Sequence, residues 1–562
     1  MAVEKMLCEL GIQDIPIIQE QPRFVVDLLE SNVVLYGSSM SGKTNFIKLL
    51  ITILHKQYRE DTEQIFILDF GGALAECESL PLVAAYFDNA NEEYVKRVFK
   101  LLEEQLKNNI SQLNGKNYRA VSENQPKHTT LFIDNVNAFL DEPRYSSYQE
   151  KLAKLCRDGL SKGITVVMTA SSTKGTTSMM SSFKQKIALE LPLESYYDIF
   201  NQKVIPVGNN PGHGFANVTV NTADNAATYL MQMGYELQLN IADDIHSPVF
   251  QDNLSKYFQG RTVEKYKRFP DALTVESYHG FVGEMPKVTP GYVSIGLDYT
   301  ESKPVGVDFD STRCVAIYGK KGFGKTNALK ALLKGFIEDE SYRFVFLDDG
   351  REQIRDFSNQ VGMERQTYIS AYQTVPLTYK KPPQGNVVIE TKLSPMQIFV
   401  KHIHEHYMNL SQVRRMNNPV LAEIYGTGIE LPSGVVDDRR NTVFVLQSKF
   451  LYVNSIASKD FMEVILPSLV ARADEMNWIF IFSDVKPISD SEPRENFHST
   501  IGTALLLDSI AEFVGERGGK SVFGSMDVKS LKEEYAPCEI GDGYFYSIEK
   551  DELKKLKFLQ AE

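Results

Sequence analysis

Short apolar runs alternate with longer amphipathic stretches along most of the chain. The runs at residues 33–36, 65–68, 131–133 and 164–168 are nearly continuous and rich in Val, Ile and Phe. Such runs are typical of strands that are buried on both faces of a parallel sheet. Residues 92–113 keep their apolar side chains at helical spacing, with charged residues on the opposite face. Strands that alternate with helices predict an α/β fold, a mostly parallel, doubly wound sheet flanked by helices.

The second half of the chain repeats these landmarks in the same order. The apolar runs at residues 315–318, 344–347, 443–446 and 479–482 follow the intervals of the first half. Residues 306–308 correspond to residues 25–27, and residues 541–543 correspond to residues 212–214. Recurrence of this kind indicates two copies of one domain. We place the boundary in the charged stretch 261–268, which runs into Pro270. The predicted domains are residues 1–264 and 265–562.

Each copy has a glycine-rich loop between a predicted strand and a predicted helix. In the pattern G-x-x-x-x-G-K-[ST], backbone N–H groups cradle phosphates, the lysine reaches the β- and γ-phosphates, and the hydroxyl binds Mg²⁺. Two matches in the same structural context are the most specific signal in the chain, and they predict two sites for ATP and Mg²⁺. The predicted nucleotide-binding residues are Gly37, Ser38, Ser39, Met40, Ser41, Gly42, Lys43 and Thr44 in the first copy, and Gly319, Lys320, Lys321, Gly322, Phe323, Gly324, Lys325 and Thr326 in the second.

The metal ligands are predicted from the P-loop hydroxyl and from the end of a second buried strand. In P-loop ATPases a carboxylate at the end of such a strand helps to hold Mg²⁺. Asp134 ends the run at residues 130–134, so Thr44 and Asp134 are the predicted metal ligands of the first copy. Thr326 is the predicted metal ligand of the second copy. Lys43 and Asp134 are the predicted catalytic residues of the first site.

The positions that would activate water are degenerate in both copies. Asn135 follows Asp134, and an amide can hydrogen-bond a water molecule but cannot accept its proton. The corresponding pair in the second copy is Gln447 and Ser448. We therefore expect slow hydrolysis at the first site and little or none at the second.

Other polar residues near the predicted strand ends have two interpretations each. Asp69 and Asp348 end neighbouring strands, and they either face the site or cap the following loop. Thr169 and Ser483 end the strand that carries a γ-phosphate sensor in RecA-like folds, or they are plain strand-end hydroxyls. Arg157 is a predicted arginine finger for a neighbouring protomer, and the alternative is an exposed helix arginine.

One short motif suggests zinc. His402-Ile-His-Glu405-His406 matches H-x-x-E-H, which places two histidines on one face of a helix. However, Ser394-Pro395 has the form of the N-cap and first residue of an ordinary helix, and the first copy has no counterpart. We expect a solvated histidine-rich face.

Composition narrows the possible partners. Lys and Arg total 60 against 73 for Asp and Glu, a net charge of −13, so the chain lacks the overall positive charge of a nucleic-acid-binding protein. The five cysteines are scattered without a C-x-x-C pair, which argues against a zinc module or a disulfide framework. No apolar run approaches the roughly 18 residues of a spanning helix, so we expect a soluble piece, and the sequence leaves open that it belongs to a membrane protein. Residues 550–557 are expected to form a short mixed-charge helix.

The motifs together resemble the FtsK/SpoIIIE branch of RecA-like P-loop motors. The resemblance lies in the first P-loop, in the strands that end in Asp69 and Asp134, and in the strand at residues 162–169. Within that branch, residues 68–72, 195–198 and 211–214 are similar to the EssC/YukB family of bacterial type VII secretion ATPases. Ser171 departs from the family pattern, which has glutamine on the sensor strand.

This resemblance implies a fragment that holds the last two ATPase domains of a membrane-anchored protein, at the cytoplasmic face of the cell membrane. It implies small helical WXG-type substrates, other subunits of a membrane secretion complex as partners, and a homo-oligomer that is hexameric in the full-length protein. No nucleic acid is expected. Two alternatives stay open: an FtsK-like DNA translocase, and a non-hydrolysing scaffold that has kept its nucleotide pockets.

Overall fold

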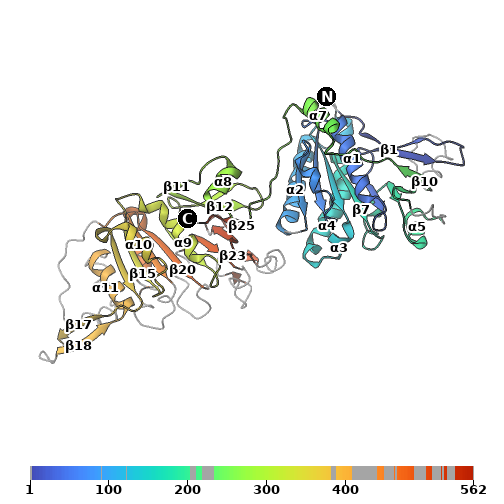
Figure 1. Ribbon diagram of the computed structural model, residues 1–562. Helices are drawn as coiled ribbons and strands as arrows, with labels where there is room; N and C mark the ends of the chain where they lie inside the picture. Colours follow the sequence, from blue (N-terminus) through green and yellow to red (C-terminus); the bar gives the residue numbers. More distant parts are fainter. Residues whose placement is uncertain are drawn as a thin grey trace. The chain divides into compact units, whose positions relative to one another are not determined.

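The structure is a computed structural model, and the chain divides into two compact units, Met1–Arg268 and Phe269–Glu562 (Figure 1). It describes residues 3–89, 92–121, 123–202, 210–217, 233–380, 388–407, 439–447, 461, 465–485, 501–508, 520–521, 524–527, 538–547 and 549–560.

The described residues of the first unit form a ten-stranded sheet with helices between its strands. Its strands are β1 (Leu7–Asp14), β2 (Arg23–Asp27), β3 (Val33–Tyr36), β4 (Glu63–Asp69), β5 (Val83–Asp88), β6 (His128–Asp134), β7 (Ile164–Ala170), β8 (Gln185–Ala188), β9 (His213–Asn217) and β10 (Gly234–Leu239). Its helices are α1 (Lys43–Gln57), α2 (Glu92–Gln112), α3 (Val136–Asp141), α4 (Ser146–Lys154), α5 (Leu193–Phe200) and α7 (Pro248–Phe258).

The second unit contains a larger sheet and two separate two-stranded sheets within its described residues. Its strands are β11 (Val288–Thr289), β12 (Tyr292–Asp298), β13 (Pro304–Asp308), β14 (Cys314–Tyr318), β15 (Arg343–Asp348), β16 (Gln366–Ser370), β17 (Val375–Lys380), β18 (Val388–Leu393), β19 (Thr442–Gln447), β20 (Ile479–Asp484), β21 (Thr503–Leu506), β22 (Lys520–Ser521), β23 (Gly524–Asp527), β24 (Asp542–Ser547) and β25 (Glu552–Phe558). Its helices are α8 (Val275–Val282), α9 (Lys325–Ile337), α10 (Arg355–Val361), α11 (Pro395–Tyr407), α15 (Leu466–Val470) and α16 (Ala473–Met476).

The two main sheets share one strand order. The first runs β2-β1-β10-β9-β8-β3-β7-β6-β4-β5, and the second runs β12-β25-β24-β21-β14-β20-β19-β15-β16, with β11 and β13 also paired to β12. The strands from β8 to β5 and from β21 to β16 are parallel, while the remaining strands extend each sheet in antiparallel pairs. In both units the P-loop strand, β3 or β14, lies inside the parallel part. The carboxyl ends of parallel strands, where such folds bind ligands, therefore lie at one edge.

The continuous apolar strands bury both faces of the second sheet. Alternate residues of β14, β15, β19 and β20 belong to two separate clusters, as the period of two along a strand requires. One cluster packs against α11 and includes Phe399, and the other packs against α9 and includes Leu332. This double covering confirms the α/β architecture predicted from the apolar runs.

The expected helix at residues 550–557 is wrong. This segment forms β25, which pairs antiparallel with β24 from Asp542↔Lys557 to Ser547↔Glu552. The lysine-rich sequence favours a helix locally, but its pairing with β24 and β12 buries Leu556 and Phe558. Tertiary pairing thus outweighs intrinsic propensity here.

The H-x-x-E-H helix is also less solvated than expected. α11 begins at Pro395, with Ser394 as its N-cap, as predicted. His404 is buried, and burial together with His406 and Arg439 lowers the pKa of His402 to about 4. No group of three or more metal-ligating side chains occurs among the described residues.

None of the helices in the described ranges has the length and apolar character needed to cross a membrane. None of the five cysteines, all of which are described, forms a disulfide, and all five are buried.

Candidate nucleotide sites

The first P-loop leaves β3 and enters α1 through glycines that other residues could not replace. Gly42 has φ 113° and caps α1, and a Cβ atom there would lie 3.0 Å from the amide nitrogen of Gly212. That same amide donates to the Ser41 carbonyl at 2.8 Å. The hairpin at residues 211–214 therefore packs directly on the loop. A left-handed backbone beside another main chain is a position for glycine.

Lys43 is folded back over its own loop. Its Nζ donates to the carbonyl oxygens of Gly37 at 2.8 Å and Ser38 at 2.7 Å. Burial lowers the pKa of Lys43, and the Asp134 carboxylate partly opposes that effect. Lysine and carboxylate thus face a common space at the carboxyl edge of the parallel strands. Within the described part of the chain, no hydrogen bond is recorded for the Thr44 hydroxyl, which opens α1 beside them.

Asp134 is held by the neighbouring strand β7. Its Oδ1 accepts a hydrogen bond of 2.5 Å from the Thr169 hydroxyl, and that hydroxyl accepts from the backbone N–H of Asn135 at 2.9 Å. Burial raises the pKa of Asp134, while the Thr169 hydrogen bond lowers it. Thr169 therefore fixes the carboxylate, and Asn135 stands at the start of α3 with a left-handed φ of 59°.

Asp69 caps its own loop. Its carboxylate accepts from the N–H groups of Gly71 at 3.1 Å, Gly72 at 2.7 Å and Leu74 at 2.8 Å, and from the Tyr86 hydroxyl at 2.9 Å. These four donors favour the capping interpretation over a site-facing role. A Cβ atom on Gly71 would lie 2.1 Å from an Asp134 oxygen, so the capped loop lies against the site.

Asn137 is a residue that sequence reasoning missed. Its Oδ1 accepts from the N–H of Ser171 at 2.7 Å, and its Nδ2 donates to the carbonyl of Lys174 at 2.9 Å. The side chain thereby fastens the loop after β7 to the start of α3. No local motif could have revealed it, because the contact exists only once β6 and β7 are known to be neighbours.

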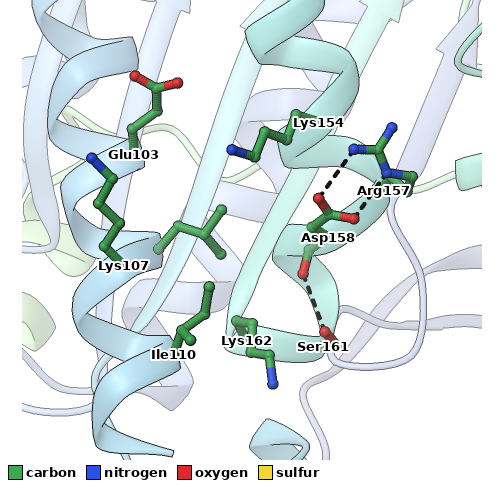
Figure 2. A pocket seen from close by; sticks show the side chains of 9 residues that line it. Glu103, Lys107, Ile110, Lys154, Arg157, Asp158, Ser161 and Lys162 are labelled. Carbon is green, nitrogen blue, oxygen red and sulfur yellow. Dashed lines mark hydrogen bonds and ion pairs between the residues drawn. The ribbon is translucent and has the colours of Figure 1, made fainter. Parts of the chain in front are cut away.

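Arg157 lies away from its own P-loop. It belongs to a π-helical turn before β7, at the amino end of a strand whose carboxyl end borders the site. Its exposed guanidinium pairs with Asp158 at 2.9 Å. Figure 2 shows both residues on one wall of a pocket of about 530 Å³, with Glu103, Lys107 and Ile110 of α2 on the other. The finger stays a prediction, one that would serve a neighbouring protomer.

The second P-loop has the same framework. Gly324 caps α9 with φ 90°, and Lys325 donates to the carbonyls of Gly319 and Lys320, the latter at 2.9 Å. The Thr326 hydroxyl, however, donates to Oε1 of Gln353 at 2.7 Å. A pocket of about 160 Å³ is lined here by Lys321, Gly322, Gly324, Lys325, Thr326, Arg351 and Gln353.

Gln447 occupies the strand-end position of Asp134 in the second unit. It is paired with Ser483 of β20, as Asp134 stands beside Thr169, and its Oε1 accepts from the N–H of Asp349 at 3.4 Å. Ser448, the predicted counterpart of Asn135, lies outside the described residues.

An asparagine after each P-loop threonine ties the helix to the antiparallel part of the sheet. Nδ2 of Asn45 donates to the Asn240 carbonyl at 2.9 Å, and its Oδ1 accepts from the N–H of Ala242 at 2.9 Å. Asn327 donates to the Leu559 carbonyl at 3.2 Å. Both units thus connect the first turn of the P-loop helix with the end of an antiparallel strand, β10 or β25.

The fold and the two loops define the class: two tandem RecA-like P-loop NTPase domains, each a mostly parallel sheet flanked by helices. The comparisons then point to type VII secretion proteins. The chain is 25% identical to "Type VII secretion system protein EssC" of Staphylococcus aureus over 301 residues, which are 52% of this chain and 20% of that protein. It is 24% identical to "ESX secretion system protein EccC" of Geobacillus thermodenitrificans over 377 residues, 64% of this chain and 24% of that protein. The chain matches no protein-family model.

Solved structures agree on the fold. EssC ATPases 2 and 3 from Geobacillus thermodenitrificans superpose with a TM-score of 0.63 at 17% identity, covering 100% of this chain and 98% of that one. Thermomonospora curvata EccC ATPases 2 and 3, in complex with a signal sequence peptide, give 0.58 at 17% identity, covering 100% and 94%. The predicted resemblance to EssC-type ATPases is therefore confirmed. The chain spans about a fifth to a quarter of the length of these curated relatives.

Proposed function

We propose that this chain is an ATP-binding module of a type VII secretion protein, in which nucleotide occupancy matters more than turnover. The observation that carries the proposal is the geometry of the first site. There, the Lys43 ammonium and the Asp134 carboxylate interact at the carboxyl edge of the parallel strands. The Thr44 hydroxyl, in the first turn of α1, makes no hydrogen bond to the described residues. The sequence similarity to EssC and EccC supports the secretion context.

The residues of the first site fit ATP with Mg²⁺. The buried Asp134 is oriented by Thr169, and with the Thr44 hydroxyl it offers the oxygen ligands that Mg²⁺ prefers. A bound Mg²⁺ would neutralise charge on the phosphate oxygens. The carbonyls of Gly37 and Ser38 hold the Lys43 ammonium in readiness, and phosphate oxygens would replace them as its partners.

We expect slow hydrolysis at this site, on the following grounds. Attack by water needs a group that orients it or takes its proton. Asn135 has an amide and no basic oxygen. The Asp69 carboxylate accepts hydrogen bonds from loop amides and from Tyr86. Asp141 pairs with Lys174, and Glu142 pairs with Arg144. The first site is thus arranged to hold nucleotide.

The partners follow from the relatives. One EccC neighbour was solved with a signal sequence peptide, and we propose that this chain likewise recognises secretion signals, with small helical WXG-type proteins as the substrate class. We also propose that it works within a homo-oligomeric secretion complex at the cytoplasmic face of the membrane. Arg157 would then reach a neighbouring protomer.

Binding of ATP tests the nucleotide part of this proposal. Titration calorimetry on the full chain with Mg²⁺ should show saturable ATP binding that weakens when Lys43 is replaced by alanine. At 100 times its Kd, ATP should stabilise the folded chain by about 2.7 kcal/mol. Single-turnover hydrolysis slower than nucleotide release supports an occupancy role. An unchanged melting temperature with ATP and Mg²⁺ would refute it.

A second experiment addresses the substrate. Immobilised WXG-type protein should retain the chain, and the amount retained should change when ATP is added. ATPase activity that is stimulated by duplex DNA and indifferent to WXG-type protein would instead support the DNA translocase alternative.

A further inference from the structure

Four exchanges distinguish the second P-loop pocket from the first. Strand register and loop position align the two units through Gly37 and Gly319, Asp69 and Asp348, and Asp134 and Gln447. Going from the first unit to the second, the exchanges are Ser39 to Lys321, Gly72 to Arg351, Leu74 to Gln353 and Asp134 to Gln447. At these four positions one carboxylate is lost and two cations are gained, while the neighbouring exchanges Phe70 to Asp349 and Ala170 to Asp484 add carboxylates beside the pocket.

Arg351 is held so that part of its guanidinium faces the pocket. Its Nε and Nη2 donate to Oδ2 of the buried Asp349, the former at 2.6 Å. A guanidinium has five N–H donors, and this side-on pair leaves Nη1 available for an anion. Arg351 lines the pocket beside Lys325 and contributes to lowering the pKa of that lysine, after burial. An anion bound between the two cations would relieve their repulsion.

The pocket does not fit a magnesium ion. The P-loop hydroxyl that would bind the metal, Thr326, is engaged by Gln353, and the strand end carries the neutral Gln447. Nearby carboxylates have other partners. Asp349 pairs with Arg351, Asp508 pairs with Lys320, and Asp484 does not line the pocket. The residues that line the pocket include Lys321, Lys325 and Arg351 but no carboxylate.

We infer that the second P-loop binds the triphosphate of ATP without Mg²⁺, with Arg351 and Lys321 supplying the positive charge that the metal supplies at the first site. This inference rests on the proposed function, since it assumes that both loops bind ATP. It replaces the metal-ligand role expected for Thr326. The consequence is a chain with one metal-dependent and one metal-independent nucleotide site.

The test uses the full chain with one loop silenced at a time. Lys43→Ala leaves the second site, Lys325→Ala leaves the first, and ATP binding to each variant is measured by calorimetry in Mg²⁺ and in EDTA. For Lys43→Ala the Kd should change by less than about threefold between the two conditions. For Lys325→Ala the Kd in EDTA should rise at least tenfold.

Arg351 is then examined in the Lys43→Ala background. Arg351→Ala should weaken binding in EDTA at least tenfold, and Arg351→Lys, which keeps the charge, should recover part of the loss. Arg355→Ala is the matched control, because Arg355 lies four residues further on over the Tyr368 ring and does not line the pocket. It should bind as its parent does, and circular dichroism melts should confirm that each variant folds.

Two results would overturn the inference: loss of ATP binding by Lys43→Ala in EDTA, or unchanged metal-free binding after Arg351→Ala. If the unmodified chain binds no ATP even in Mg²⁺, the proposed function itself fails, and the two failures are therefore distinguishable.

Discussion

The hydrogen bond between Thr169 and Asp134 should set the pH range over which the first site binds Mg²⁺ with ATP. Metal binding needs the ionised carboxylate. Burial raises the pKa of Asp134, and the Thr169 hydroxyl opposes this by donating to Oδ1 at 2.5 Å. Thr169→Val keeps the side-chain shape and removes the donor. The pKa of Asp134 should therefore rise, and binding should be lost at a higher pH than in the unmodified chain.

The size of the shift follows from the bond that is removed. A hydrogen bond to a charged group contributes about 1.5–3 kcal/mol, and one pKa unit corresponds to roughly 1.4 kcal/mol. The acidic midpoint of Mg²⁺-dependent ATP binding should thus move up by about one to two pH units. The assay is calorimetric titration from pH 4.5 to 8 in the Lys325→Ala background, which isolates the first site.

Thr169→Ser is the matched control, because it keeps the hydroxyl and loses only a methyl group. Its midpoint should stay close to that of the parent. If Thr169→Val and Thr169→Ser share the parent's midpoint, then Thr169 does not control the ionisation of Asp134, and the reasoning is refuted.

Three further predictions concern single side chains. Gly42→Ala should weaken ATP binding at the first site at least tenfold, because its φ of 113° and a Cβ contact at 3.0 Å would distort the loop; calorimetry measures this. His128→Ala should destabilise the first unit by about 3–5 kcal/mol in urea unfolding, because the fully buried Glu63 loses its ionisable partner and keeps the Thr130 hydroxyl. Asn137→Ala should speed amide hydrogen exchange at Ser171, where Gln149→Ala, which removes a hydrogen bond to Leu140, should not.

Local sequence was enough to predict the parallel core. Strands such as β6 and β7 are buried along their whole length, and this environment leaves a continuous apolar run in the middle of each strand. β25 carries no such pattern. Four of its seven residues are Glu or Lys, and its strand conformation depends on β24 and β12, so the helix expected there was a misinterpretation of local propensity.

The candidate sites likewise combine features that a short stretch of sequence encodes with features that depend on the fold. The P-loops are encoded in eight consecutive residues, and their position between a buried strand and a helix could be predicted from the sequence. Other contacts join separate strands and loops. They orient Asp134, hold the loop after β7 and bring cations to the second pocket. Asn137 and Arg351 make contacts that become visible only when the neighbouring strands are placed. The histidines of α11 show the same limit, because the solvated face expected from their local pattern is partly buried by tertiary packing.

The asparagine after each P-loop threonine connects the first turn of the P-loop helix to the chain that follows an antiparallel strand. Asn45 follows Thr44 directly, and its side chain hydrogen-bonds the main chain of Asn240 and Ala242. Between these two residues lies the exposed Ile241, where the chain leaves β10 toward α7. A displacement of that helical turn would therefore be passed directly to residues 240–242. In the second unit Asn327 makes the corresponding connection by donating to the Leu559 carbonyl, which follows β25.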